Sequence, residues 1–171
     1  MAHAIGRVTI VGLGLIGSSV ARAIKAKLPD VAVTGHDADP DVRAEAQALG
    51  FCDAVSDDAA EAVEGADLVI LAVPVGRMAD AAAAIAPGLS AHAIISDVGS
   101  SKAGVGAALR AALPGHVVVP AHPVAGTENS GPAAGFATLF YGRWCIVTAA
   151  PDAPPDAVRA VTGLRPALGA K

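Results

Sequence analysis

Short apolar segments alternate along this chain with longer stretches that are rich in alanine. Residues 8–11 and 68–73 contain only apolar and β-branched side chains, which is the pattern of strands that are buried on both faces. The stretches between such segments have the length and composition of helices. Strands that alternate with helices form a parallel sheet that helices cover on both faces. The sequence therefore predicts an α/β domain with a doubly wound, mainly parallel sheet.

Glycine, proline and aspartate mark where these segments begin and end. Pro40 suits the first turn of a helix and Gly50 its end, and Asp57 or Asp58 can cap the next short helix. A proline-rich turn at 151–155 leads into a last helix, which Pro166 would kink or end. We predict strands at 8–11, 31–36, 68–73, 93–96 and 117–119, and helices at 15–27, 40–50, 76–86, 102–113 and 156–164, with a short one ending at 63.

Charge and hydropathy exclude several classes of protein. The 12 Lys and Arg residues are outnumbered by 16 Asp and Glu residues, so a net charge of −4 leaves no basic excess for binding nucleic acid. No apolar run approaches the ~20 residues that cross a membrane. The first residues lack the pattern of a signal peptide, so we expect a cytoplasmic protein. Cys52 and Cys145 have no metal-ligand spacing, so we expect no metal site, and we favour free thiols over a disulfide.

A G-x-G-x-x-G motif lies between the first predicted strand and the first predicted helix. Its first glycine permits a tight turn, its second lets the backbone approach a pyrophosphate, and its third allows close packing of helix and strand. The helix N-terminus offers free N–H groups and the positive end of its dipole. We therefore predict a dinucleotide site rather than a turn without a ligand. The predicted cofactor-binding residues are Gly12, Leu13, Gly14, Leu15, Ile16 and Gly17.

An acidic residue follows the second predicted strand at the distance that a dinucleotide site requires. Asp37 lies 20 residues beyond Gly17, where a carboxylate accepts hydrogen bonds from the ribose and repels a 2′-phosphate, so we expect NAD rather than NADP. Asp39 is an alternative for this role, although we favour it as the cap of the next helix. Val73 and Pro74 end the strand at 68–73 and are expected to line the cofactor channel.

Two polar clusters, at 96–102 and 122–131, follow later strands at the same predicted edge of the sheet. His122 there can relay the proton of a substrate hydroxyl, and a serine such as Ser100 can hydrogen-bond the same oxygen. Structural roles remain open: Ser100 or Ser101 can cap the next helix, Asp97 can bind turn amides, and His122 can be a loop histidine.

Four motifs run through the chain: V-G-L-G-L-I-G-S-S from Val11, A-V-P-V from Ala72, D-V-G-S-S-K from Asp97 and H-P-V-A-G-T-E-N-S-G from His122. Together they resemble the prephenate and arogenate (cyclohexadienyl) dehydrogenases of tyrosine biosynthesis. The last motif is the most specific of the four. The resemblance covers nearly the whole chain from Arg7 onward and implies a Rossmann domain and NAD(P)-dependent oxidative decarboxylation of a small-molecule substrate, prephenate or arogenate.

The resemblance also implies roles for individual residues. By this likeness His122 polarises the C4 hydroxyl of the substrate, and Ser100 contacts the same hydroxyl and the nicotinamide region. Thr127 and Glu128 match positions that line the substrate cavity, and Lys102 matches the lysine of the family motif.

Members of this family are about twice as long as this chain. They carry a helical C-terminal domain that makes the homodimer and supplies an arginine for the substrate carboxylate, and Arg143, Arg159 and Arg165 match no such motif. We therefore expect residues 1–171 to be one NAD(P)-binding domain, with a core at about 1–150 and a terminal helix at 151–171 that leads toward the absent domain. We expect it to bind NAD, to turn over prephenate poorly by itself, and to expose an apolar face.

Two other functions are compatible with the glycine motif. One is another Rossmann dehydrogenase of the β-hydroxyacid type, which is not expected to carry the motif that begins at His122. The other is a non-catalytic NAD-binding module, in which replacing His122 would change no activity.

Overall fold

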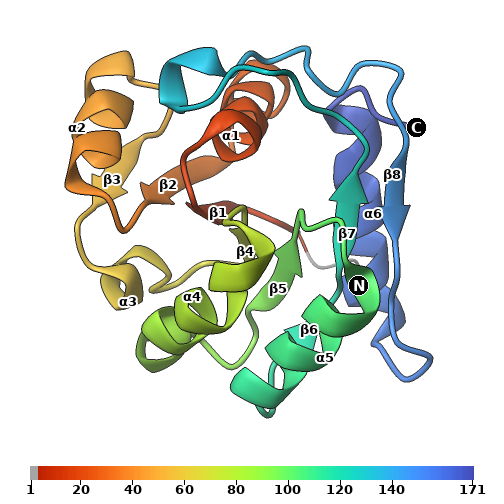
Figure 1. Cartoon of the computed structure of the whole chain (residues 1–171). Helices are drawn as coiled ribbons and strands as arrows, with labels where there is room; N and C mark the ends of the chain where they lie inside the picture. The colour runs from red at the N-terminus through yellow and green to blue at the C-terminus, as the bar shows by residue number, and fades with distance from the viewer. Residues whose placement is uncertain (1–3) are drawn as a thin grey trace.

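A computed structural model describes residues 4–171, apart from the side chains of Lys102 and Ala103. The start of the chain, where the sequence predicts no signal peptide, therefore lies partly outside the described residues. Six strands form one parallel sheet in the order β3-β2-β1-β4-β5-β6 (Figure 1). They are β1 (Arg7–Val11), β2 (Ala32–His36), β3 (Ala54–Ser56), β4 (Leu68–Leu71), β5 (Ile94–Asp97) and β6 (Val117–Val118). This order confirms the predicted doubly wound sheet.

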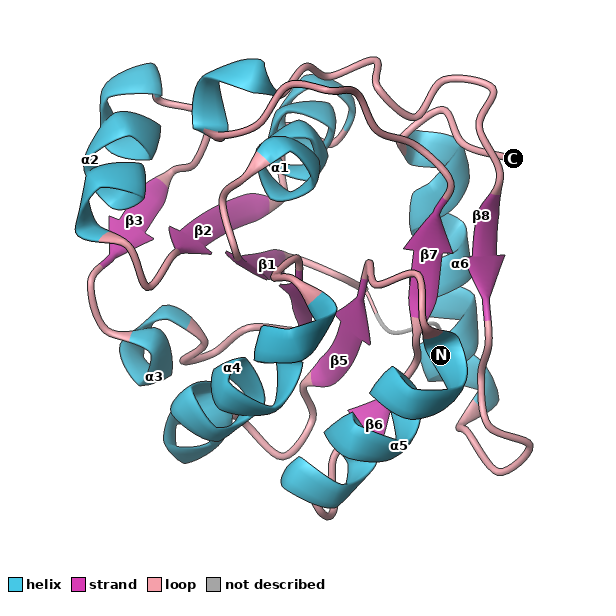
Figure 2. Cartoon of the chain, in the orientation of Figure 1, coloured by secondary structure: helices cyan, strands magenta, loops and turns pink. Residues whose placement is uncertain are grey.

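Helices cover both faces of the sheet, as Figure 2 shows. Side chains of α1 and α6 belong to the hydrophobic cluster on one face, and side chains of α4 and α5 belong to the cluster on the other. The helices are α1 (Leu15–Lys27), α2 (Pro40–Leu49), α3 (Ala59–Ala62), α4 (Met78–Ile85), α5 (Lys102–Ala112) and α6 (Pro155–Ala167). Short 3-10 turns are η1 (Val75–Arg77), η2 (Ala86–Gly88) and η3 (Pro132–Ala134).

Strand β1 lies at the centre of the sheet and is the point where the strand order reverses. Val11, its last residue, pairs with His36 of β2 on one side and with Leu71 of β4 on the other. The connections after β1 and β4 leave in opposite directions, so a crevice opens beyond the carboxyl ends of these two strands. Any ligand of this fold is expected in that crevice.

A second sheet of two antiparallel strands, β7 (Ala121–Pro123) and β8 (Cys145–Val147), was not predicted from the sequence. Both strands have three residues, too few to give a periodic pattern. The backbone of the chain's last residues runs alongside β8, because the N–H of Cys145 donates to the carbonyl of Lys171, whose N–H donates to Arg143. The strand predicted at 93–96 lies one residue later, at Ile94–Asp97. The strand predicted at 117–119 ends one residue earlier, at Val118.

Three other segments differ from their predicted bounds by two residues or more. The strand predicted at 68–73 ends at Leu71, and the helix predicted at 76–86 begins at Met78 after the η1 turn. Helix α6 continues through Pro166 instead of ending there. The proline lacks the N–H that would bond to the carbonyl of Thr162, and the Nε–H of Arg165 donates to that carbonyl instead, at 3.3 Å. The helix therefore loses little at its last turn.

Large apolar side chains are exposed on the β7–β8 sheet. Trp144 is 67% exposed and Ile146 is 50% exposed, and the N–H of Val124, itself 46% exposed, donates to the carbonyl of Trp144. We call these three residues the β8 patch. Among the described residues, no helix is long and apolar enough to cross a membrane.

Candidate functional site

The turn after β1 is built around a glycine that no other residue can replace. Gly12 has φ +99°, and a Cβ there would lie 2.6 Å from the carbonyl oxygen of Ala72. Its N–H donates to the carbonyl of His36 at 2.8 Å, which joins the turn to the end of β2. The predicted role of Gly12 in a tight turn therefore agrees with its geometry.

The other two glycines of the motif differ in what surrounds them. A Cβ on Gly17 would lie 1.8 Å from the carbonyl oxygen of Gly12, so α1 packs on the turn only because this residue has no side chain. A Cβ on Gly14 would meet nothing within 4 Å. The fold therefore does not require glycine at position 14. Glycine is required there only if a ligand approaches the backbone closely, because a side chain would occupy the ligand's space.

The residues between these glycines can offer backbone groups rather than side chains to a ligand. Leu13 is fully buried, and Leu15 and Ile16 are half-buried against the same core. Gly14 is the N-cap of α1 and has no side chain to bind the first N–H groups of the helix, and no acidic residue occupies the first turn. These N–H groups and the helix dipole are suited to an anion such as a pyrophosphate.

Asp37 lies at the end of β2, next to the glycine turn. Its Oδ2 accepts the N–H of Leu13 at 2.8 Å and its Oδ1 accepts the N–H of Asp39 at 3.0 Å. Asp39 caps α2 by accepting the N–H of Asp41 at 2.9 Å, which confirms the cap role. The Nη1 of Arg43 donates to the carbonyl of Asp37 at 2.7 Å, a contact that no sequence pattern indicates.

A groove of about 660 Å³ lies beyond the carboxyl ends of β1, β2 and β4. Val73 and Pro74 lie on its wall, as the sequence predicts for a cofactor channel. Residues of η1 and α4 continue this wall. Among them, Arg77 and Asp80 form an exposed ion pair at 3.7 Å. The lining residues are Gly12, Gly14, His36, Asp37, Ala38, Asp39, Ala72, Val73, Pro74, Arg77, Asp80, Ala81 and Ala84.

His122 lies on β7, and its ring contacts the turn that follows β5. Its Nδ1 is 3.0 Å from the carbonyl oxygen of Val98, an atom that can only accept a hydrogen bond. Nδ1 therefore carries the proton of the neutral ring, and Nε2 keeps a lone pair that can accept a proton. The half-buried ring thus has the tautomer that a general base requires.

The turn between β5 and α5 also carries Asp97 and Ser100. Asp97 is 1% exposed, and its two oxygens accept the N–H groups of Gly99 at 2.8 Å and Ala121 at 3.3 Å. Its predicted role in binding a turn amide is thereby confirmed, and the second bond adds a link to β7. Ser100 is exposed two residues beyond Val98, and Ser101 is the N-cap of α5 without a side-chain cap bond. The side chain of Lys102 lies outside the described part of the structure.

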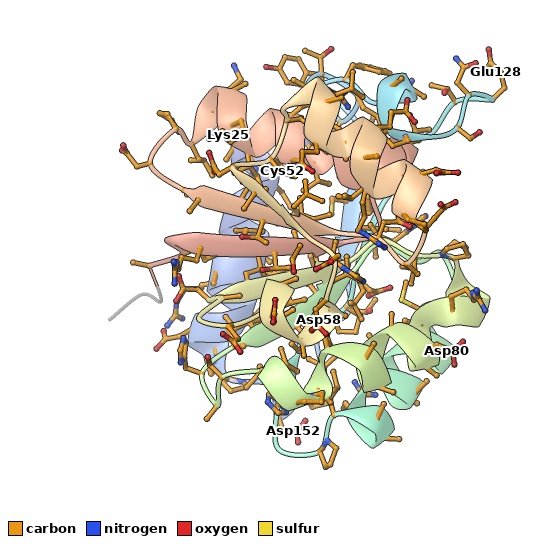
Figure 3. All side chains as sticks on the ribbon, turned by 90° about the vertical axis from the view of Figure 1, so that its left-hand side faces the viewer. Lys25, Cys52, Asp58, Asp80, Glu128 and Asp152 are labelled. Carbon is orange, nitrogen blue, oxygen red and sulfur yellow. The ribbon has the colours of Figure 1, made fainter. Side chains whose placement is uncertain are left out.

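Thr127 and Glu128 lie on a long loop that leaves β7 and crosses to η3 (Figure 1). Both side chains are exposed, and the Oγ1 of Thr127 accepts the N–H of Asn129 at 3.2 Å. In Figure 3, Glu128 and Asp80 lie toward the edge at which the strands end, Glu128 above and Asp80 below. The loop therefore extends toward the same edge of the sheet as the groove. His122 and Val98 are joined by a direct hydrogen bond.

Neither cysteine is among the residues that line the groove. Cys52 and Cys145 are thiols outside any disulfide, as the sequence predicts. Burial, and secondarily the charge of Asp53, raises the pKa of the Cys52 thiol to about 12. Within residues 4–171, no group of three or more His, Cys, Asp and Glu side chains is arranged to hold a metal ion.

Comparisons with known proteins agree with these observations. The family model described as prephenate dehydrogenase, nucleotide-binding domain, matches residues 20–171. A cyclohexadienyl dehydrogenase of Zymomonas mobilis is 51% identical over 151 residues, which are 88% of this chain and 52% of that protein. A prephenate dehydrogenase of Bacillus subtilis is 33% identical over 159 residues, 92% of this chain and 43% of that protein.

A solved structure has a similar fold. The prephenate dehydrogenase of Aquifex aeolicus, in complex with hydroxyphenyl propionate and NAD+, superposes with a TM-score of 0.90 and 27% identity. The match covers 98% of this chain and 59% of that one. This chain thus spans about half the length of the curated relatives that it matches.

Proposed function

This chain belongs to the family of prephenate dehydrogenase nucleotide-binding domains, and from that premise we propose that it binds NAD for the oxidative decarboxylation of prephenate or arogenate in tyrosine biosynthesis. The observation that carries the proposal is the hydrogen bond between His122 Nδ1 and the carbonyl of Val98. It leaves Nε2 of His122 as a proton acceptor next to the turn that follows β5, at the same edge of the sheet as a groove that suits a dinucleotide.

The residues of the groove fit NAD. The open space at Gly14 admits a pyrophosphate, and the first N–H groups of α1 can bind it. Asp37 uses one lone pair of each oxygen for backbone N–H groups, so lone pairs remain for the ribose hydroxyls. Its negative charge disfavours the 2′-phosphate of NADP. When bound, NAD supplies the acceptor for the two electrons of the oxidation.

His122 and Ser100 act on the substrate hydroxyl in this proposal. Nε2 of His122 accepts the proton of the C4 hydroxyl while C4 becomes a carbonyl carbon, and the Ser100 hydroxyl hydrogen-bonds the same oxygen. The ring then loses its carboxylate as CO₂ and becomes aromatic, which gives 4-hydroxyphenylpyruvate from prephenate or tyrosine from arogenate. Thr127 and Glu128 border the substrate at the loop after β7.

We further propose that these residues form the cofactor-binding half of the active protein. The relatives extend well beyond the matched region. The arginines near the end of this chain have local partners, since Arg159 pairs with Asp156 and Arg165 donates to the carbonyl of Cys145. A further domain is then needed to bind the substrate carboxylate and to form the homodimer, and the β8 patch is a suitable surface for it.

The test uses the full-length protein that carries this domain. His122→Asn is expected to lower kcat with prephenate by about 10²–10⁴-fold, the usual contribution of a general base, and to leave the Kd for NAD unchanged. His92→Asn is the control, because His92 is exposed beside Asp67 and lies before the start of β5, opposite the carboxyl ends of the strands. Small β-hydroxyacids are assayed in parallel. An unchanged kcat in His122→Asn, or faster turnover of a hydroxyacid than of prephenate and arogenate, would contradict the proposal.

A further inference from the structure

A buried carboxylate connects the two loops that carry the proposed catalytic groups. Asp97 is the last residue of β5 and is 1% exposed. One oxygen accepts the N–H of Gly99, in the turn that leads to Ser100, and the other accepts the N–H of Ala121, the residue before His122. The side chain therefore bridges the β5–α5 turn and β7 on the side of Ala121, the residue next to His122.

These two bonds enclose the contact between His122 and Val98. Val98 lies between Asp97 and Gly99 in the chain, and its N–H donates to the carbonyl of Leu71 at 3.2 Å. The N–H of Gly99 is bonded to the Asp97 carboxylate. Because the carbonyl of Val98 belongs to the same planar peptide group as this N–H, it points the opposite way, toward His122 Nδ1 at 3.0 Å. The bond to the N–H of Ala121 holds the start of β7, and with it His122, next to the turn that carries Val98.

The carboxylate of Asp97 is held away from water at the end of a buried strand. Asp97 borders a partly open cavity of about 60 Å³ that is also lined by Val20, Ile70 and Arg165. A carboxylate beside apolar side chains is unfavourable unless its hydrogen bonds offset the lost hydration. A role in orienting a reacting group explains why the position holds Asp rather than an apolar residue.

We propose that Asp97 is a positioning residue that fixes His122 as its Nδ1–H tautomer. Asp97 does this through the backbone. Its bonds to the N–H groups of Gly99 and Ala121 fix the position of the Val98 carbonyl relative to the His122 ring. In the other tautomer, the lone pair of Nδ1 would face the lone pairs of the Val98 carbonyl, which is repulsive. The importance of this tautomer for catalysis rests on the proposed function, but the tautomer itself can be measured without substrate or NAD.

The experiment is a ¹⁵N NMR measurement of the His122 ring in the chain of residues 1–171. The two ring nitrogens have distinct shifts when protonated or bare, so their shifts give the tautomer ratio of the neutral imidazole. The unmutated chain is expected to show Nδ1–H as the main form. Asp97→Asn keeps the shape but turns an N–H₂ group toward one of the two backbone N–H groups. We expect the ratio of Nδ1–H to Nε2–H to fall about five-fold, which corresponds to losing ~1 kcal/mol of hydrogen bonding.

Asp67→Asn is a matched control. Its carboxylate also accepts two backbone N–H groups, from Gly6 at 2.8 Å and Arg7 at 2.9 Å, but at the opposite end of the sheet. Asp67→Asn is expected to lower stability without changing the tautomer of His122. Equal changes in both variants would mean that the tautomer follows general stability and would overturn the proposal.

A second variant tests the same link if Asp97→Asn does not fold. A Cβ on Gly99 would lie 3.0 Å from Asp97 Oδ2, so Gly99→Ala displaces the carboxylate by a few tenths of an ångström without removing it. The tautomer ratio is expected to shift in the same direction. Gly104→Ala is its control, since a Cβ there meets nothing within 4 Å. The proposal fails if the unmutated chain is mainly Nε2–H, or if Gly99→Ala leaves the ratio where Gly104→Ala leaves it. Neither result depends on whether the chain acts on prephenate.

Discussion

The Oδ2 of Asp37 accepts the backbone N–H of Leu13 at 2.8 Å, so the carboxylate at the end of β2 is bonded to the glycine turn that follows β1. The bond gives Asp37 a structural role in addition to the ribose contact proposed for it. It orients the turn and points the carboxylate along the groove before any ligand arrives. A replacement at this position must therefore preserve the acceptor if it is to report on the charge alone.

Asp37→Asn is expected to change the choice of cofactor. The amide oxygen can still accept one backbone N–H, but the charge that disfavours a 2′-phosphate is lost, and Arg43 is nearby. We expect the Kd for NAD to rise about ten-fold, since a hydrogen bond to a charged group contributes ~1.5–3 kcal/mol. The preference for NAD over NADP should fall by a similar factor, as measured by isothermal titration calorimetry.

Asp39→Asn separates the two acidic candidates. Asn is as good an N-cap as Asp, so this variant should retain both stability and the preference for NAD. If Asp39→Asn relaxes the preference and Asp37→Asn does not, the ribose contact has been assigned to the wrong residue.

Two glycines of the same motif should respond in opposite ways to alanine. Gly17→Ala places Cβ at 1.8 Å from the Gly12 carbonyl oxygen and should cost about 3 kcal/mol or more in unfolding free energy. Gly14→Ala meets nothing in the protein, so its stability should change by less than about 1 kcal/mol. Its Cβ occupies the space offered to the pyrophosphate, so the Kd for NAD should rise at least ten-fold. Urea unfolding and NAD titration give both quantities, and tight NAD binding by Gly14→Ala would refute the assigned site.

The parts of the fold that the sequence predicts correctly are those that depend on residues close together in the chain. Strands that are buried on both faces are mostly apolar, so β1, β4 and β5 were found, with ends displaced by one or two residues. The glycine motif was found because backbone geometry demands glycine at Gly12 and Gly17. Asp39 was assigned correctly as a cap because capping depends on neighbours in the chain.

The features that were missed depend on contacts between distant segments. The β7–β8 sheet joins Ala121 to Val147 across a long loop, and neither strand has a signal of its own. The path of α6 through Pro166 depends on a neighbouring arginine. Asp97 could be recognised as a turn residue, but its bond to Ala121, 24 residues away in the chain, follows only from the fold. An acidic residue that ends an apolar strand was the one available sign.

The loop that carries Thr127 and Glu128 should loosen when its attachment to α1 is disturbed. Ser19 Oγ accepts the N–H of Phe136 at 3.0 Å, and Arg22 donates to the carbonyl of Pro132 at 2.9 Å. A Cβ on Gly135 would lie 2.1 Å from Ser18 Oγ and 3.0 Å from the backbone nitrogen of Ser19. Gly135→Ala should therefore cost about 1–2 kcal/mol in unfolding free energy.

Hydrogen exchange locates this effect. Amides of residues 131–136 should exchange faster in Gly135→Ala, whereas the strands of the main sheet should keep their protection. Gly126→Ala lies in the same loop, where a Cβ meets nothing within 4 Å, and should leave exchange in residues 131–136 unchanged. Equal exchange in the two variants would show that the attachment to α1 does not hold the loop.

The thiol of Cys52 should give the protein an alkaline instability. Burial raises its pKa in the folded chain from 9.0 to about 12, with the charge of Asp53 adding to the effect and those of Arg22 and Lys25 opposing it. Between these two pH values the unfolded chain has released the proton and the folded chain has kept it. Stability is therefore fully present below about pH 9 and falls as pH rises, by up to ~1.4 kcal/mol per pH unit for one proton.

Cys52→Ala removes this proton while every tyrosine and lysine remains, so the difference in unfolding free energy between the two chains isolates the thiol. In urea unfolding, we expect that difference to be constant from pH 7 to about 8.5 and then to move steadily in favour of the variant up to pH 10.5. The direction follows because the Cys52 thiol, which the variant lacks, loses its proton in the unfolded chain but not in the folded chain over this pH range. Loss of that proton stabilises the unfolded state relative to the folded state. A difference that stays constant to pH 10.5 would mean that the folded thiol titrates at its ordinary value and is not shielded by the core.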